Sequence, residues 1–235
     1  MGLVAAVLAG LAAPALAQDE PALGSRLRHS GNLPLAVANQ RAVRGAHNYA
    51  TCVVHRRESL ARAYLDATTA QEIAKSSSAL FRDIECLDIP GFSGFAIARR
   101  IAMPEDVQRG ILAEAMLKQE GGLRAAFAPQ PLAKTYQAPW SAISGRGPVV
   151  DEMAVCVSQT DPQGVANLLA TLPESEDEQQ AIGAISPYLG PCLQNGAQLT
   201  ANRQSLRAAL AEALYHRWEA QQAAGNAAPA AAAGG

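Results

Sequence analysis

Residues 109–117 read RGILAEAML, and residues 207–215 read RAALAEALY. Apolar positions recur every three to four residues in both stretches, which predicts two amphipathic helices with the same pattern. Two cysteines precede each stretch, so a pattern of cysteines and helix occurs twice along the chain. We therefore expect an all-α fold that arose by tandem duplication of one helical unit.

Other features also occur in both halves of the chain. Each half contains four segments with helical patterning. In the second half we expect Asp161 to cap the second segment, with Pro162 at its first helical position, and Pro187 to end or bend the third. The third segment of each half begins with a capping box. These are Thr69-x-x-Glu72 in the first half and Ser175-x-x-Glu178 in the second. In a capping box the hydroxyl and the carboxylate each accept a hydrogen bond from a backbone N–H at the helix start. We expect the four-segment units to pack as one pseudo-symmetric domain or as two small domains.

The four cysteines permit three disulfide pairings, and the repeat favours one of them. It joins Cys52 to Cys86 and Cys156 to Cys192, which are nearly equally far apart along the chain. Each bond would close one unit and stabilise it by roughly 3–4 kcal/mol in the chain-entropy model. Structural zinc sites and redox-active thiol pairs usually contain closely spaced cysteines such as C-x₂-C, which this sequence lacks.

Both ends of the chain are expected to lie outside the folded part. Residues 1–17 have the pattern of a secretory signal peptide, with an apolar run over 3–13 and a small-x-small cleavage site at 15–17. No Lys or Arg precedes the apolar run, so an ordinary N-terminal helix is the alternative. Residues 221–235 contain only Ala, Gly, Gln, Asn and Pro, which predicts a disordered tail.

Between these ends we expect three parts. Residues 18–120 form the first helical unit, residues 121–148 a connector, and residues 149–220 the second unit. The connector is rich in Gly and Pro, but it also contains three aromatic residues, too many for a free linker. We expect it to be irregular yet packed over the seam between the units.

The charge distribution excludes some functions. The net charge of −2 argues against a protein dedicated to nucleic-acid binding. The early chain is rich in Arg, whereas residues 147–202 contain neither Lys nor Arg. This asymmetry predicts either two solvated faces of opposite charge or attraction between the halves or between copies. No segment after residue 17 is long and apolar enough to span a bilayer, so we expect a soluble periplasmic or secreted protein.

One loop differs between the halves. The first half has extra residues after its second cysteine, including the Gly/Pro-rich stretch 89–95 with Phe92 and Phe95. Because loops carry function more often than cores do, these two aromatic residues are candidates for an interaction loop. The simpler alternative is that both fold back onto the core.

No catalytic, cofactor-binding or metal-binding motif occurs in the sequence. His47 and His55 lie about two helical turns apart, but the neighbouring arginines would repel a cation; His29 and His216 add no metal-ligand spacing. Glu114 and Glu212 occupy equivalent positions and could form a symmetric carboxylate pair. We expect them instead to lie off the apolar stripe and to pair with other charges nearby, namely Lys118 and Arg217.

These observations favour a non-catalytic protein that binds a partner or serves the cell envelope structurally. They identify neither a cofactor nor the protein partner. The alternative is an enzyme whose site lies in the seam between the two units, which would require a polar pocket there with perturbed pKa values.

Overall fold

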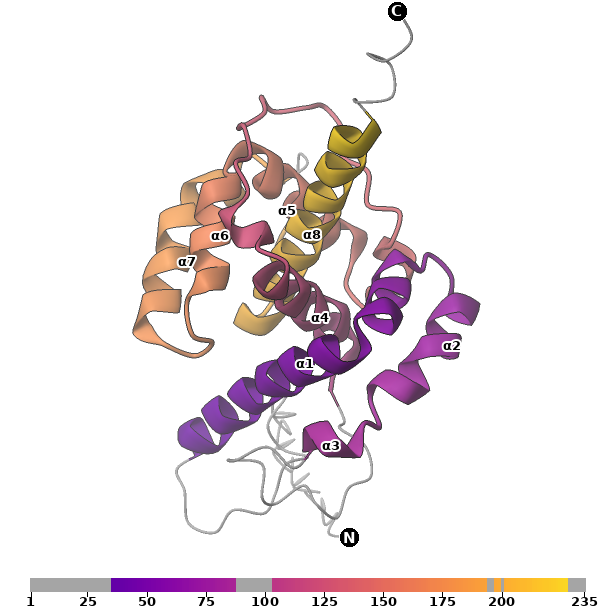
Figure 1. Ribbon diagram of the computed structural model, residues 1–235. Helices are drawn as coiled ribbons and strands as arrows, with labels where there is room; N and C mark the ends of the chain where they lie inside the picture. The colour runs from indigo at the N-terminus through magenta and orange to yellow at the C-terminus, as the bar shows by residue number, and fades with distance from the viewer. Residues whose placement is uncertain (1–34, 88–102, 194–196, 200, 228–235) are drawn as a thin grey trace, which may run out of the picture.

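The computed structural model describes residues 35–87, 103–193, 197–199 and 201–227, and over these residues the protein is entirely helical (Figure 1). None of the described helices is long and apolar enough to cross a membrane. The elements are α1 (Leu35–Asp66), α2 (Ala70–Leu80), α3 (Ile84–Leu87), α4 (Glu105–Gln119), η1 (Gly122–Arg124), η2 (Ser141–Ile143), α5 (Pro148–Thr160), α6 (Pro162–Ala170), α7 (Glu176–Leu189) and α8 (Arg203–Ala227).

Helices α4 and α8 form the centre of the fold and share the most extensive contact between any two elements described. Helices α1, α2 and α3 lie on one side of this pair, and α5, α6 and α7 lie on the other (Figure 1). The two central helices touch at their backbones, because a Cβ atom on Gly110 would lie 2.2 Å from the Cα atom of Ala208. We call the contact between α4 and α8 the seam.

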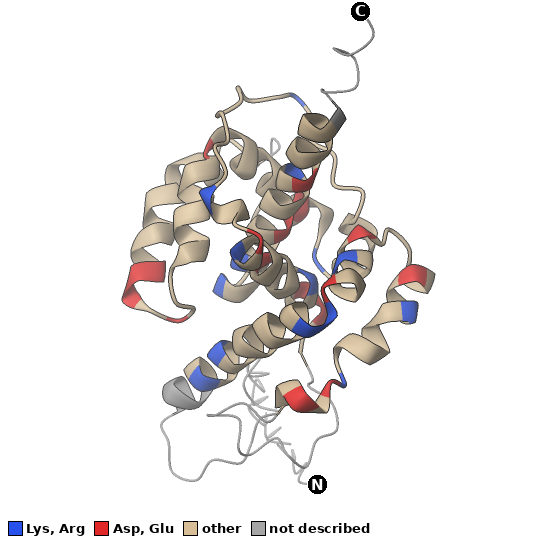
Figure 2. Cartoon of the chain, in the orientation of Figure 1, with Lys and Arg blue, Asp and Glu red and all other residues tan. Residues whose placement is uncertain are grey.

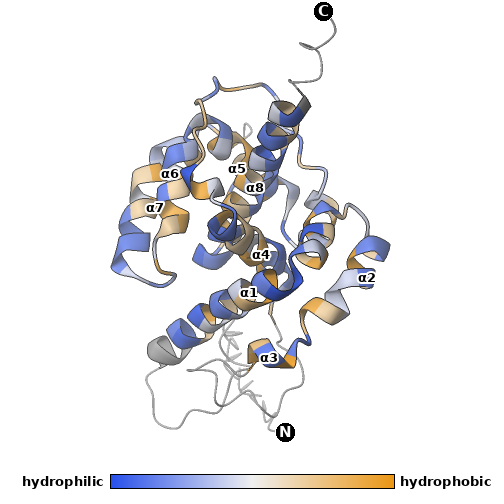
Figure 3. Cartoon of the chain, viewed as in Figure 1, coloured by the Kyte–Doolittle hydropathy of each residue, from blue (hydrophilic) through white to orange (hydrophobic). Residues whose placement is uncertain are grey.

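The apolar stripes predicted for the two central helices are confirmed. Leu112 and Met116 of α4 and Leu210 and Leu214 of α8 are fully buried. They belong to one hydrophobic cluster with members from both halves of the chain, and apolar residues are accordingly found on helices on both sides of the seam (Figure 3). The described part of the chain therefore has one core that both halves share.

The first two helical segments of each half are joined differently. In the first half they form a single helix, α1, which is interrupted by non-helical backbone at Arg57 (φ −135°, ψ 39°). In the second half the chain breaks at Asp161, whose side chain accepts a hydrogen bond from the Gly164 N–H, and Pro162 begins α6. This agrees with the N-cap and first-turn proline expected there.

The two capping boxes have different outcomes. At α2 the box is complete: Thr69 accepts from the Glu72 N–H, and the Glu72 carboxylate accepts from the Thr69 N–H. At α7 the Ser175 hydroxyl accepts from the Glu178 N–H at 3.1 Å. The Glu178 carboxylate, however, is buried and accepts from the N–H of Glu174 rather than of Ser175. Only half of the second predicted box therefore forms.

Three boundaries of the helices differ from the local sequence pattern. Pro187 does not end α7, which continues to Leu189; the Gly183 carbonyl, which would have paired with the missing proline N–H, accepts from the Ser186 hydroxyl instead. The third segment of the first half is divided into α2 and α3 rather than being one helix. Helix α8 continues to Ala227, beyond the predicted start of the tail at 221, because Ala and Gln are strong helix formers.

Two disulfides and the connector complete the described structure. Cys52 of α1 is bonded to Cys86 of α3, and Cys156 of α5 is bonded to Cys192 just after α7, which is the pairing predicted from the repeat. The connector contains only two short 3₁₀ helices, yet its Trp140 is buried and its other two aromatic residues pack against the core. As predicted, the connector is irregular and packed.

Candidate functional site

The seam contains two ion pairs that cross from one central helix to the other. Arg109 of α4 donates from Nε to Glu212 Oε1 of α8 at 2.5 Å. Arg207 of α8 donates to both carboxylate oxygens of Glu114 on α4, at 2.8 Å each. All four residues are at most 2% exposed. The expectation that the two glutamates lie off the buried face is therefore wrong, because each is bound by an arginine of the other central helix. Basic and acidic residues accordingly occur on both central helices (Figure 2).

Each of these arginines also binds the end of a second helix. Arg109 donates to the carbonyls of Tyr64 (2.7 Å) and Leu65 (2.5 Å), in the last turn of α1. The last carbonyls of a helix have no partner within it and carry its negative dipole end, so a guanidinium satisfies both requirements.

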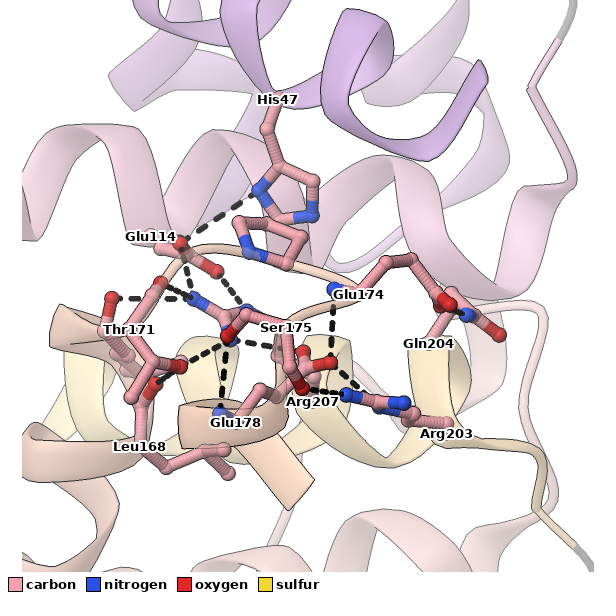
Figure 4. A network of polar contacts seen from close by, with 12 residues as sticks. His47, Glu114, Leu168, Thr171, Glu174, Ser175, Glu178, Arg203, Gln204 and Arg207 are labelled. Atoms are coloured by element: carbon pink, nitrogen blue, oxygen red, sulfur yellow. Dashed lines mark hydrogen bonds and ion pairs between the residues drawn. The ribbon is translucent and has the colours of Figure 1, made fainter. Parts of the chain in front are cut away.

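Arg207 makes the matching contacts in the second half. It donates to the carbonyls of Leu169 at 3.1 Å and Thr171 at 2.9 Å, where α6 ends. Its Nη1 also donates to Glu178 Oε1 at 2.8 Å, and Arg203 reaches the other oxygen of that carboxylate at 2.5 Å (Figure 4). The Glu178 carboxylate is thus bound by Arg207 and Arg203 rather than by the Ser175 N–H, which explains why the second capping box is incomplete.

The connector contributes a third buried arginine. Arg146 donates to Asp151 Oδ1 at 2.7 Å, to Glu212 Oε2 and to the carbonyl of Asp106 at 2.8 Å. The Ser144 hydroxyl donates to the other oxygen of Asp151 at 2.6 Å. The connector is therefore fastened to both central helices and to α5 by buried charge.

Of the two charge partners expected at helical spacing, Lys118 is observed and Arg217 is not. Lys118 does bind Glu114, with Nζ 2.6 Å from Oε1. Arg217 does not bind Glu212 but donates to backbone carbonyls, as described below. His47 lies 3.5 Å from Glu114 (Figure 4).

The remaining histidines do not gather into a site. His216 Nε2 lies 3.9 Å from Glu212 Oε1, and His55 is exposed. His29 falls outside the described residues, as do Phe92 and Phe95, whose assignment as an interaction loop stays a prediction. Among the described residues, no group of three His, Cys, Asp or Glu side chains could hold a metal ion.

The arginines shift the pKa values of the buried carboxylates. Burial alone would raise the pKa of Glu212, but His216, Arg109 and Arg146 together lower it to about 2. Because 3.9 Å is longer than a hydrogen bond, we assign most of the lowering to the two guanidinium groups. Burial is likewise outweighed at Glu114, where His47 and Arg207 hold the pKa well below its usual range.

The chemistry of the seam is therefore that of a structural ion-pair network. Glu114 and Glu212 are ionised, and each is held by at least one guanidinium, which leaves them poorly suited to exchange protons with a substrate. Asp151 differs, since burial raises its pKa against the opposing effect of Arg146. Networks of this kind perturb pKa values without any catalytic role.

A cavity of about 600 Å³ lies between the connector, α5 and α8. We call it the connector cavity. Its wall includes Trp140, whose ring is stacked on His216 with centroids 4.0 Å apart and planes 18° from parallel. Arg217 lies next to them and donates to the carbonyls of Ser158 and, at 2.5 Å, Ala128.

The aromatic pair in this wall has unused hydrogen-bonding capacity. Among the described residues, Trp140 Nε1 is buried and has no hydrogen-bond partner, and buried His216 Nε2 lies 3.9 Å from Glu212 Oε1, beyond hydrogen-bond distance. No sequence pattern indicates this site, because Trp140 is distant along the chain from His216 and Arg217 and the three residues belong to no motif. The one available signal was the aromatic content of the connector.

Comparison of the chain with protein-family models, with curated proteins and with solved structures found no match. We therefore infer its function from the chemistry of the seam and of the connector cavity.

Proposed function

We propose that the chain is a non-catalytic binding protein, exported to the periplasm or secreted, whose ligand occupies the connector cavity. The observation that carries this proposal is the contrast between the two polar regions. In the seam the buried glutamates are neutralised by arginines. In the connector cavity, the guanidinium of Arg217 has no carboxylate partner and Trp140 Nε1 has no hydrogen-bond partner among the described residues.

The residues around the cavity support binding rather than catalysis. Its lining contains no Asp, Glu, Lys or Cys, so the candidate acid or base there is His216. The candidate nucleophile, Ser158, is 1% exposed, and its hydroxyl donates to the Val155 carbonyl at 2.8 Å. A nucleophilic serine needs a base within hydrogen-bond reach and an exposed oxygen, and this one is buried with its proton engaged by the backbone.

Export is supported by two features of the chain. The two disulfides are typical of proteins in oxidising compartments, and the pattern of residues 1–17 is typical of a cleaved signal peptide. Together they favour the periplasm or the extracellular space.

A tandem duplication accounts for the repeated features, and we propose it as the origin of the fold. Arg109 and Arg207 share two kinds of contact, one to a carboxylate of the other central helix and one to carbonyls at the end of a second helix, and each half has one disulfide. The breaks at Arg57 and Asp161 lie equally far after the first cysteine of their half. Duplication predicts this agreement, whereas unrelated halves would match in helix content alone.

The alternative function, an enzyme with its site in the seam, has less support. A smaller cavity of about 350 Å³ lies at the edge of the seam and is lined in part by Glu105, Asp106 and Arg146. Arg146 is already bound by Asp151 and by Glu212. The acids at this edge remain the groups to mutate first if a hydrolytic or transferase activity is ever detected.

Mass spectrometry of the protein recovered from the cells that produce it tests the proposal. Under denaturing conditions we expect the mass of a chain that begins at Gln18 and has lost four hydrogens to its two disulfides. Under native conditions we expect a mass that is higher by that of one small molecule. The same protein after denaturation and refolding in clean buffer is the control, which should show no added mass. A chain with Met1 and four free thiols would contradict export, and a native mass equal to the denatured mass would contradict binding.

A further inference from the structure

We propose that the ligand of the connector cavity is a small organic acid, whose carboxylate pairs with Arg217 and whose flat or apolar body lies against the wall formed by Trp140. This inference rests on the proposed function, since it names the class of molecule that the cavity takes.

The charge of the cavity is positive and uncompensated. Arg217 is half-buried, and no carboxylate of the described residues lies within ion-pair distance of it. Arg109, Arg146 and Arg207 differ from it, because each binds at least one buried carboxylate. An arginine that is partly removed from water without an acidic partner favours an anion in the adjoining space.

The guanidinium of Arg217 has N–H groups that could donate hydrogen bonds to a ligand. Its Nη1 donates to the carbonyls of Ser158 and Gln159, and its Nη2 donates to the carbonyl of Ala128. Of its five N–H groups, these bonds leave the Nε–H and one Nη2–H without a partner among the described residues. A carboxylate has the geometry to accept from two guanidinium N–H groups at once.

The rest of the polar lining is neutral. It includes the side chains of Gln130, Gln137, Gln159 and Gln221, and it contains no acid that would repel an anion. Amide side chains both donate and accept hydrogen bonds, so they suit the amide or hydroxyl groups of a ligand body rather than a second charge. The lining therefore favours a ligand with one negative charge and neutral polar substituents.

The aromatic wall suits a flat or apolar body. Trp140 is 7% exposed and lines the cavity with Val155 and Ala213. Its Nε1 is buried without a hydrogen-bond partner among the described residues, and such groups are uncommon in folded proteins unless water or a ligand serves them. The volume of about 600 Å³ lies within the range of sites that hold small molecules.

The pKa of Arg217 agrees with this reading. Burial lowers it, with no carboxylate to oppose the effect. At Arg207 burial acts in the same direction, but Glu114 and Glu178 raise the pKa above its ordinary value. A bound carboxylate would raise the pKa of Arg217, as Glu114 and Glu178 raise that of Arg207 in the seam.

The competing explanation is that Arg217 only fastens the connector to the end of α5. Its three carbonyl contacts would serve that purpose without any ligand, as those of Arg109 and Arg207 do at α1 and α6. The experiment must therefore separate binding from the stability of the connector.

The probe is hippurate, which carries a carboxylate, an amide and a benzene ring, and its matched control is the neutral amide hippuramide. Both are titrated into the oxidised full-length protein labelled with ¹⁵N. The indole N–H signal of Trp140 reports on the cavity, and that of Trp218, which is buried in the core, is the internal reference. We expect hippurate to shift the Trp140 signal saturably and to bind about tenfold or more tighter than hippuramide.

Two variants test the role of the charge. Arg217→Gln should abolish the preference for hippurate over hippuramide, but it also removes the contacts to the connector. Gln137→Glu avoids that problem, because Gln137 is exposed at the cavity and the substitution adds a negative charge with a side chain of similar size. It should weaken hippurate binding by about tenfold more than hippuramide binding, and it should leave the melting temperature unchanged.

Equal affinity for hippurate and hippuramide, or no saturable change at Trp140, would overturn the inference. So would full hippurate binding by Arg217→Gln, which would leave Arg217 as a clamp of the connector only. The proposed function fails separately: a neutral molecule found on the protein from cells would refute the acid but keep the binding function. If the protein binds hippurate but carries no added molecule when it is recovered from cells, the preference for an organic acid stands and the proposed binding function is refuted.

Discussion

Replacing Gly110 by alanine should destabilise the protein, although alanine is the better helix former. Gly110 lies within α4, where Gly→Ala ordinarily stabilises by roughly 0.8–1 kcal/mol. Here the new Cβ would lie 2.2 Å from both the Cα and the carbonyl oxygen of Ala208, and 2.4 Å from its carbonyl carbon. Unstrained carbon atoms stay about 3.5–4.0 Å apart, so the contact is about 1.5 Å too short.

The size of the effect follows from what must move. Backbone atoms cannot rotate away as a side chain does, so α4 and α8 would have to separate. Overpacking typically destabilises by about 1–3 kcal/mol and sometimes by more. The separation would also stretch the ion pairs of Arg109 and Arg207, which flank the contact. We therefore expect a net loss of about 3 kcal/mol or more, or a melting temperature roughly 6–12 °C lower.

Gly183 provides the matched control. It lies within α7, and a Cβ there would meet no atom within 4 Å. Gly183→Ala should therefore stabilise by about 0.5–1 kcal/mol. Urea unfolding of the oxidised proteins, followed by circular dichroism at 222 nm, measures both variants. A Gly110→Ala variant as stable as Gly183→Ala would refute the backbone contact of α4 with α8.

Three further predictions concern the seam and the disulfides. Arg109→Met should destabilise by about 3–5 kcal/mol, because it removes one of the two guanidinium groups that hold the buried Glu212 carboxylate and leaves two buried carbonyls without a donor. Lys118→Ala, at an exposed partner of Glu114, should change stability by at most about 1 kcal/mol; similar losses in urea unfolding would contradict this. The pKa of Glu212 falls from 4.5 to about 2 on folding, so its contribution, on the order of 3 kcal/mol, is present above pH 4.5 and is lost as the pH falls towards 2. Glu212→Gln should flatten the dependence of unfolding free energy on pH in that interval, and an unchanged slope would refute the assignment. The double variant Cys52→Ser/Cys86→Ser should lose roughly 3–4 kcal/mol in the same measurement, and an unchanged urea midpoint would contradict a stabilising role for that bond.

Local features of the fold were predictable, and long-range ones were not. The break at Asp161 and the cap at Thr69 depend on residues within one turn, so the sequence alone indicated them. Glu178 shows where this reasoning stops. Its spacing from Ser175 predicted a full capping box, but Arg207, which is distant along the chain, takes its carboxylate.

The candidate site was even less accessible to sequence reasoning. Trp140 belongs to the connector, whereas His216 and Arg217 belong to the last helix, and no periodicity relates the two segments. The stacking of Trp140 on His216 depends on how the connector folds over α5 and α8. The aromatic content of the connector predicted that it would pack, but it did not indicate what would pack against it.

By itself, the sequence determined the helical class, the pairing of the cysteines and the apolar stripes of α4 and α8, because these depend on periodicity and on spacing within each half. Only the tertiary structure decided the partners of Glu114 and Glu212. At helical spacing, the sequence could point only to charges on the same helix, of which Lys118 is one. The buried arginine partners lie on the other central helix, and they are reached because Gly110 lets the two backbones touch.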